Sequence, residues 1–235
     1  EVLKERHEQA KALCRKLGYT SCAEVRGAEK LQAIHRLVAD DAATLAMILQ
    51  TNALPRLQHL YLGLNGFGDA GMQALCKGLG RGTAPSLRTL SLARNNFGPA
   101  GAEALAAALP RGAMPKLEWL GLAENPIGNR GMAALAAPLR KLPALKRLVL
   151  DDCEIGDEGV ASLVDNLGKD DFKKLERLYL YGNKITDAGA VKLLAALDAG
   201  GLPKLVNDMW KGDLLKDNPV SAVAVEAVKA ALAKR

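Results

Sequence analysis

Leucines recur through the middle of the chain in a pattern that switches between two periods. In five successive stretches, three leucines are spaced three and two residues apart, and an asparagine or cysteine follows three residues after the third. The spacing of two has the period of a β-strand with one buried face. Further along each stretch, a glycine and two leucines follow at intervals of four, which places them on one face of a helix. The pattern predicts a repeated unit of strand, turn, helix and loop.

Five copies of this unit fill residues 57–204. They start at Leu57, Leu87, Leu117, Leu145 and Leu175, so each is 28–30 residues long. One copy cannot bury its leucines alone, whereas stacked copies form a parallel sheet and a continuous aliphatic core. We therefore expect an α/β solenoid. The residues after the strand leucines are expected to hydrogen-bond backbone groups of adjacent coils: Asn65, Asn95, Asn125, Cys153 and Asn183.

Residues near the start of each helical half have the chemistry of helix caps. Asp69, Asp157 and Asp187 stand where a side-chain acceptor would satisfy free amides, and we expect each to cap its own helix. Pro138 is expected to end the helix of the third copy a turn early.

The two flanks predict caps for the solenoid. Residues 1–56 are expected to form a helical N-terminal cap, with helices over 1–17, over 28–39 and from Asp40 or Asp41 to Gln50. The third helix would be the helical half of a degenerate repeat without a regular strand. Residues 205–235 are expected to hold a degenerate sixth repeat, with Asp213 at the asparagine position, and a capping helix that begins at residues 217–219 and ends near Lys234.

The repeat resembles the ribonuclease-inhibitor-like class of leucine-rich repeat. That class also occurs in NOD-like receptors, in the GTPase-activating protein for Ran and in tropomodulin. The resemblance covers about residues 57–204 strongly. It implies a right-handed horseshoe with a concave parallel sheet and convex helices. It says little about function, because unrelated activities share the fold.

Strand alternation predicts which side chains face outward from the sheet. If Leu60 and Leu62 point inward, His59 and Tyr61 point outward, and the same rule applies in every copy. Aromatic and arginine side chains gather at these positions, and such residues dominate protein-binding hot spots. Aromatic residues also suit a pleated surface and pair across strands, so simple sheet packing is the alternative. The predicted partner-binding residues on the concave face are His59, Tyr61, Arg94, Trp119, Glu124, Arg147, Asp152, Arg177, Tyr179 and Tyr181.

Composition and charge narrow the function classes. The net charge is +6, but the sequence shows no basic stripe of the kind that tracks phosphates, so nucleic acid is not favoured as a partner. No apolar stretch approaches the ~20 residues of a membrane helix. The densest acidic group, residues 151–158, lacks the spacing of a calcium loop and is expected to be a solvated face. No catalytic, metal or cofactor motif is present.

The cysteines and the missing signal peptide favour a cytoplasmic or other reducing compartment. Cys14 and Cys22 are close enough in sequence to bridge, but free buried thiols are the expected state there. The chain begins with Glu1, so the question whether a targeting segment has been removed stays open.

The leading hypothesis for function is a non-enzymatic module or scaffold that binds another protein and that could be a subunit or fragment of a larger assembly. The resemblance implies two alternatives. One is a GTPase-activating protein like that for Ran, although such a relative typically carries an acidic tail and this chain ends in Ala-Lys-Arg. The other is the ligand-sensing domain of a NOD-like receptor.

Overall fold

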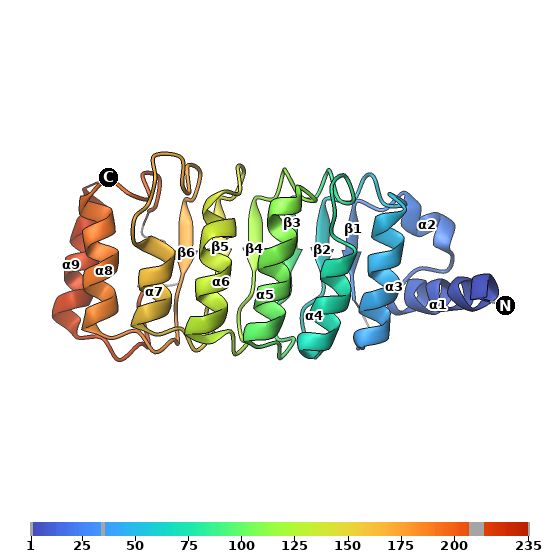
Figure 1. Cartoon of the computed structure of the whole chain (residues 1–235), viewed down its shortest axis with the longest axis horizontal. Helices are drawn as coiled ribbons and strands as arrows, with labels where there is room; N and C mark the ends of the chain where they lie inside the picture. The colour runs from blue at the N-terminus through green and yellow to red at the C-terminus, as the bar shows by residue number, and fades with distance from the viewer. Residues whose placement is uncertain (1, 34–35, 207–213, 235) are drawn as a thin grey trace.

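The computed structural model describes residues 2–33, 36–206 and 214–234. Its strands form one parallel sheet in the order β1-β2-β3-β4-β5-β6, with each strand beside its sequence neighbours. Figure 1 shows the helices lined up on one side of this sheet, from the N-terminal cap at one end to α9 at the other. The strands are β1 (Lys30–Gln32), β2 (His59–Tyr61), β3 (Thr89–Ser91), β4 (Trp119–Gly121), β5 (Arg147–Val149) and β6 (Arg177–Tyr179).

Each strand is followed by a helix, and we call each such pair a coil, numbered one to six by its strand. The helices of coils one to six are α3 (Ala39–Gln50), α4 (Gly68–Lys77), α5 (Pro99–Ala108), α6 (Gly128–Arg140), α7 (Asp157–Val164) and α8 (Asp187–Asp198). A 3₁₀ turn, η1 (Leu109–Arg111), extends α5. The flanking helices are α1 (Val2–Lys16), α2 (Cys22–Arg26) and α9 (Ala222–Ala233).

The core is the space between sheet and helices, and the repeated leucines fill it. In coil four, Leu120 in the strand, Leu122 just after it, and Leu135 and Leu139 from α6 are all fully buried. The equivalent leucines of neighbouring coils join them in one continuous cluster. The expected parallel α/β solenoid is therefore confirmed, because helices alternate with the strands of a single sheet.

The N-terminal region differs from the expectation of a helix over residues 28–39. Residues 30–32 instead form β1, whose Leu31 pairs in register with Leu60 and is fully buried. The amide of Leu37 donates to Asn65 Oδ1, as the amide of Phe67 does to Asn95. Coil one therefore has its own strand, because pairing with β2 outweighs the helical spacing of its apolar residues. Ile34, part of that helical pattern, lies outside the described residues.

The first helix is confirmed over most of its predicted length, but only its second half packs. Leu13, Cys14 and Leu17 are buried, whereas Val2 and Leu3 are 61% and 81% exposed. Gly18 follows the helix with φ of 82°, a left-handed conformation that suits glycine at a helix end.

The helix-start residues cap the following coil rather than their own. Asp69 Oδ1 accepts from the amides of Gly98 and Gly101, at 2.8 and 2.7 Å. Asp157 likewise accepts from the amides of Thr186 and Gly189, at 2.8 and 2.9 Å. Burial raises the pKa of Asp157, but the hydrogen bonds from Thr186 and Gly189 outweigh burial and lower it overall. The prediction of self-capping was wrong, because adjacent helices lie close enough for a side chain in one to reach the amides of the next.

Asn129 and Asp187 repeat this contact, with Asn129 Oδ1 at 2.7 Å from the amide of Gly156 and Asp187 Oδ1 at 2.6 Å from the amide of Ser221. Coil three carries Pro99 at this position, which has no side-chain acceptor. The next helix then begins differently, with Gly128 at φ of 62° and its amide bonded to the carbonyl of Cys153.

Pro138 does not end α6 early, because the helix continues to Arg140. Leu135 and Leu139 flank the proline and are fully buried, so core packing holds the last turn in place.

The C-terminal segment ends the array with the turn of one further repeat. The sequence prediction placed the asparagine position of this turn at Asp213. Asn218 takes the asparagine position: its Nδ2 donates to the carbonyl of Leu180 at 2.8 Å, and its Oδ1 accepts from the amide of Ile185 at 3.0 Å. The last helix starts at Ala222 with Ser221 as its N-cap, later than predicted. Asp213, the residue predicted for the asparagine position, lies outside the described residues. So do Asp208 and Trp210, which the 30-residue period would place at the two strand leucine positions of this repeat.

Candidate functional site

The side of the sheet away from the helices carries a cleft of about 440 Å³, and we call this side the sheet face. The first outward residue of each strand lies in register with the next, from His59 through Thr89, Trp119 and Arg147 to Arg177. All five line the cleft, together with Tyr61, Arg88, Glu118, Lys146 and Glu176. Of the ten residues predicted for partner binding, the structure brings His59, Tyr61, Trp119, Arg147 and Arg177 together here.

The end of the cleft near coil two is held by polar and ring contacts. His59 Nδ1 lies 3.0 Å from Thr89 Oγ1, and the His59 and Tyr61 rings stack with centroids 6.3 Å apart. Lys30 Nζ sits 5.2 Å from the centroid of the Tyr61 ring. These contacts orient the tyrosine and histidine rings before any ligand binds.

Trp119 lies along its own strand, over Gly121. A Cβ atom at residue 121 would stand 2.5 Å from Trp119 Cη2, so a larger side chain there would displace the indole. Gly121 therefore provides the space in which the ring rests on the sheet. Trp119 stays partly exposed, because one strand residue with no side chain cannot enclose it.

A charge network runs along the cleft at the residues that precede the strands. Arg88 forms an ion pair with Glu118, whose other oxygen lies 3.0 Å from Lys146 Nζ. The hydrogen bond from Lys146 and the bond from Arg88 lower the pKa of the Glu118 carboxyl. Sequence reasoning missed Glu118, Lys146 and Glu176. Their signal was an alternation of sign at one repeat position, from Arg88 to Glu176.

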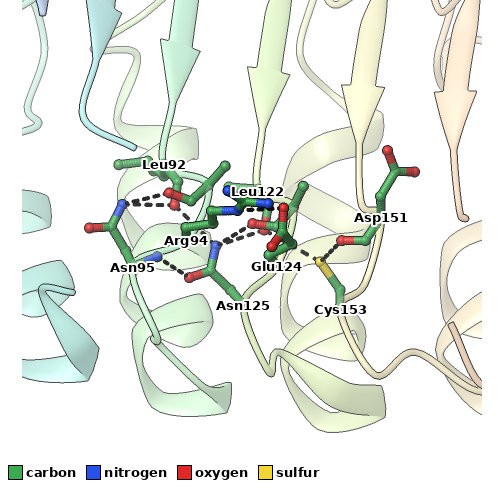
Figure 2. A network of polar contacts seen from close by, with 10 residues as sticks. Leu92, Arg94, Asn95, Leu122, Glu124, Asn125, Asp151 and Cys153 are labelled. Atoms are coloured by element: carbon green, nitrogen blue, oxygen red, sulfur yellow. Dashed lines mark hydrogen bonds and ion pairs between the residues drawn. The ribbon is translucent and has the colours of Figure 1, made fainter. Parts of the chain in front are cut away.

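The other predicted residues lie near the carboxyl ends of the strands. Arg94 Nε is 2.6 Å from Glu124 Oε1, and Figure 2 shows this pair bridging adjacent coils. Tyr179 is the last residue of β6 and is partly buried. Tyr181 is exposed, and its hydrogen bond to Asp217 raises its pKa.

Asp152 lies in an acidic environment at the same edge. Burial, Glu124, Asp151 and Asp217 all raise its pKa, in that order, while Arg94 opposes them. The expectation that the whole 151–158 stretch is solvated was wrong for Asp151, which is buried and accepts from the Tyr181 amide at 3.1 Å.

Beneath this edge, buried amide side chains link the coils. Asn125 Oδ1 accepts from the amide of Asn95 at 2.9 Å, and its Nδ2 donates to the carbonyls of Leu92 and Leu122 at 3.0 and 2.7 Å (Figure 2). Asn65, Asn95, Asn183 and Asn218 occupy the same position in other coils.

Coil five interrupts this row with Cys153. Its thiol donates weakly to the carbonyls of Leu122 and Asp151, at 3.4 and 3.3 Å (Figure 2). It cannot supply the acceptor that an asparagine oxygen would offer to the preceding coil, and the amide of Ile127 bonds to Asn125 O instead. Burial raises the pKa of the Cys153 thiol to about 12, so it stays protonated.

A family model for leucine-rich repeats matches four segments of the chain, at residues 54–76, 83–106, 141–164 and 173–194. These segments overlap coils two, three, five and six of the structure. The chain therefore contains leucine-rich repeats.

Comparisons with individual proteins add nothing to this assignment. No curated protein matches the sequence. Among solved structures, the leucine-rich-repeat chain is similar to one titled as the crystal structure of a TLR13–ssRNA13 complex, with 19% sequence identity and a TM-score of 0.36. The match covers 86% of this chain and 31% of the other, so this chain spans less than a third of the length of that one.

Two further properties of the described leucine-rich repeats bear on what the site can do. Within residues 2–33, 36–206 and 214–234, no group of three or more histidine, cysteine, aspartate or glutamate side chains is arranged to hold a metal ion. In the same ranges no helix is both long and apolar enough to span a bilayer.

Proposed function

We propose that this leucine-rich-repeat protein is a non-enzymatic binding module or scaffold whose protein partner docks on the sheet face. Leucine-rich repeats are protein-binding modules, and the sheet face of this chain carries partly exposed aromatic and arginine side chains. The observation that carries the proposal is the cleft, because Trp119, Tyr61, Arg147 and Arg177 line one continuous surface. Tryptophan, tyrosine and arginine supply most hot-spot energy in protein interfaces.

The placement of Trp119 favours docking over simple sheet packing. Cross-strand pairing would set the indole against a neighbouring strand's side chain. Instead the ring lies over Gly121 of its own strand and keeps part of its surface open to the cleft. A prepositioned aromatic surface loses little conformational entropy when a partner covers it.

The proposal is tested by partner capture with sheet-face variants. Trp119→Ala and Tyr179→Ala, singly and together, are used as bait in extracts beside the unmodified chain, and retained proteins are quantified by mass spectrometry. The matched control is Val191→Ala, since Val191 is an exposed apolar residue on α8, on the helical side. We expect loss of specific partners with the sheet-face variants and none with the control. Equal capture by all variants, with unchanged circular dichroism and melting temperature, would remove the sheet face as the binding surface.

Finer assignments belong to the same proposal. Units of 28–30 residues with an α-helix in each coil support the ribonuclease-inhibitor-like subclass. The division into a cap at 1–56, repeats at 57–204 and a closing segment at 205–235 is proposed with one amendment, that both ends contain a full or partial coil.

Four free cysteines support a reducing compartment such as the cytoplasm. The GTPase-activating and NOD-like-receptor alternatives stay predictions, and a small-GTPase turnover assay tests the first.

A further inference from the structure

Two arginines stand side by side in the cleft. Arg147 and Arg177 are register partners on adjacent parallel strands, about 4.8 Å apart in the backbone. Like charges in directly opposed positions destabilise a sheet. An anion bound at Arg147 would reduce this repulsion.

Arg147 carries a second sign of an absent ligand. Its Nε is buried and has no hydrogen-bond partner among the described residues, and no ion pair joins its guanidinium to any residue of those ranges. The other nearby cations differ, because Arg88 and Lys146 both pair with Glu118. A buried donor without an acceptor is costly, so such groups call for a partner that is not part of the chain.

We propose that the cleft binds one carboxylate side chain of an extended segment in the partner protein, with Arg147 as the donor and Trp119 as the adjoining wall. This proposal rests on the proposed function, since it names the chemistry of the same partner. Arginine presents paired N–H groups that match a carboxylate in two parallel hydrogen bonds. Arg177 adds positive charge from the next strand.

The surroundings favour a single carboxylate over a polyanion such as nucleic acid. Glu118 and Glu176 also line the cleft, and Glu124, Asp151 and Asp152 lie at the far ends of the same strands. A regularly spaced row of phosphates across this face would meet these acidic groups. A partner segment that places one acidic side chain beside Arg147, with neutral or basic residues on either side of it in its own sequence, avoids repulsion from these acidic groups.

The test is selection of a phage-displayed library of random 12-residue peptides on the immobilised full chain. Parallel selections use Arg147→Ala, Arg147→Glu, Trp119→Ala and the control Arg130→Ala. Arg130 is an exposed arginine on α6 that pairs with Glu103 on α5, on the helical side. Enriched peptides are synthesised with a fluorescent label and measured by anisotropy, together with variants in which each acidic residue is replaced by its amide. A labelled single-stranded oligonucleotide of random sequence is measured in the same way.

We expect the unmodified chain and Arg130→Ala to enrich peptides with one required aspartate or glutamate, and its amide variant to bind at least tenfold more weakly. Arg147→Ala should lose this requirement, and Arg147→Glu should select lysine or arginine in its place. Binding that depends on Trp119 but tolerates the amide, or that favours oligonucleotides over peptides, would overturn the carboxylate assignment. The first of these outcomes would leave the proposed function standing. Peptides that bind equally well when Arg147 or Trp119 is replaced would refute both the carboxylate assignment and the proposed docking on the sheet face.

A separate observation concerns two thiols in the N-terminal cap. Cys14, near the end of α1, has its Sγ 3.0 Å from the Sγ of Cys22, the first residue of α2. Cys14 is buried, whereas Cys22 is partly exposed. The Cys22 thiol is thus open to a reagent, with Cys14 directly behind it.

We infer that Cys14 and Cys22 form a reversible disulfide that ties α1 to α2 when a hydroperoxide is present. The Cys22 thiolate attacks the peroxide O–O bond, forming a sulfenic acid and releasing water or an alcohol. The Cys14 sulfur then attacks the Cys22 sulfur, the S–O bond breaks, and water leaves with the thiol proton. Two thiols are oxidised and one peroxide is reduced. Dithiol reductants reverse the step by exchange.

The disulfide is tested by treating the chain with one equivalent of hydrogen peroxide, followed by mass spectrometry of the intact and digested protein. We expect a loss of two mass units, mapped to a cross-link between Cys14 and Cys22, and a melting temperature raised by a few degrees until dithiothreitol is added. The buried Cys76 and Cys153 serve as internal controls, because burial raises both pKa values to about 12. Cys14→Ser should leave a sulfenic acid on Cys22. Intermolecular dimers, or oxidation with no internal cross-link, would refute the inference.

Discussion

Replacing Asn125 by alanine is the sharpest test of the links between coils. The Asn125 side chain is fully buried and accepts from the amides of Asn95 and Phe97 at 2.9 and 3.4 Å. Neither amide has another acceptor within the described residues. An unsatisfied buried donor costs about 1–3 kcal/mol, so two predict a loss of about 2–6 kcal/mol in the free energy of unfolding. The carbonyls that Asn125 also bonds each keep a second donor, from Asn95 Nδ2, Arg94 N and Cys153 Sγ.

Urea unfolding followed by circular dichroism measures this loss. The matched control is Gln50→Ala, which removes another amide side chain that bonds a carbonyl of the next coil, Lys77 O at 3.0 Å, but on the exposed surface. We expect the control to change stability by less than about 0.5 kcal/mol, as exposed substitutions usually do. If Asn125→Ala cost no more than Gln50→Ala, the buried amide row would not hold the coils together.

Three further predictions concern particular positions. Cys153→Asn should raise the free energy of unfolding by about 1 kcal/mol in a thermal melt, because it completes the amide row, and a loss would show that the site accepts only sulfur. Gly121→Ala should displace Trp119 and shift its emission to longer wavelength in a Trp210→Phe background; an unchanged spectrum would contradict the observed ring placement. Because its pKa is lowered on folding, Asp157 contributes stability above pH ~4 that is lost as the pH falls through the folded-state pKa. Asp157→Asn should therefore flatten the acid limb of melting temperature against pH, and an equally steep limb would exclude this contribution.

The repeated leucines made most of the fold predictable, because each has only one way to be buried when copies stack. This reasoning did not identify Leu31 as a strand residue. It lies alone, without a second leucine two residues later, and its spacing to the following apolar residues suits a helix equally well. Its pairing with Leu60 decides the matter, and that contact is made between two coils.

The closing coil was misplaced for a different reason. A fixed period carried the asparagine position to Asp213, whereas the structure has Asn218 there, 35 residues after Asn183. A local pattern held the better signal, because a leucine three residues before an asparagine and a proline after it, as at Leu215 to Pro219, also occurs at Leu122 to Pro126. Insertions in loops shift the period without changing such local patterns.

The strand residues of the cleft could be predicted from the sequence, whereas the residues of the cleft that precede the strands could not. Outward alternation selects Trp119 and Arg147 directly. Glu118 and Lys146 precede the strands, where no simple alternation applies, and their role follows from the spatial sequence Arg88, Glu118, Lys146 along three coils. Side-chain pairing across coils becomes visible only once the register of the strands is known.

The transfer of helix capping between coils has a consequence for lengthening the array by design. Coil five receives an acceptor from Asn129 and supplies one through Asp157, so duplicates of it inserted after itself would each find the partner they need. The helix start of coil three is capped by Asp69, but coil three itself has Pro99 at the capping position. A duplicate placed after coil three would therefore have no side-chain acceptor for the amides at its own helix start. An engineer choosing a module to multiply should therefore take coil five, with Cys153 replaced by asparagine so that the buried amide row continues, and leave coil three as a single copy.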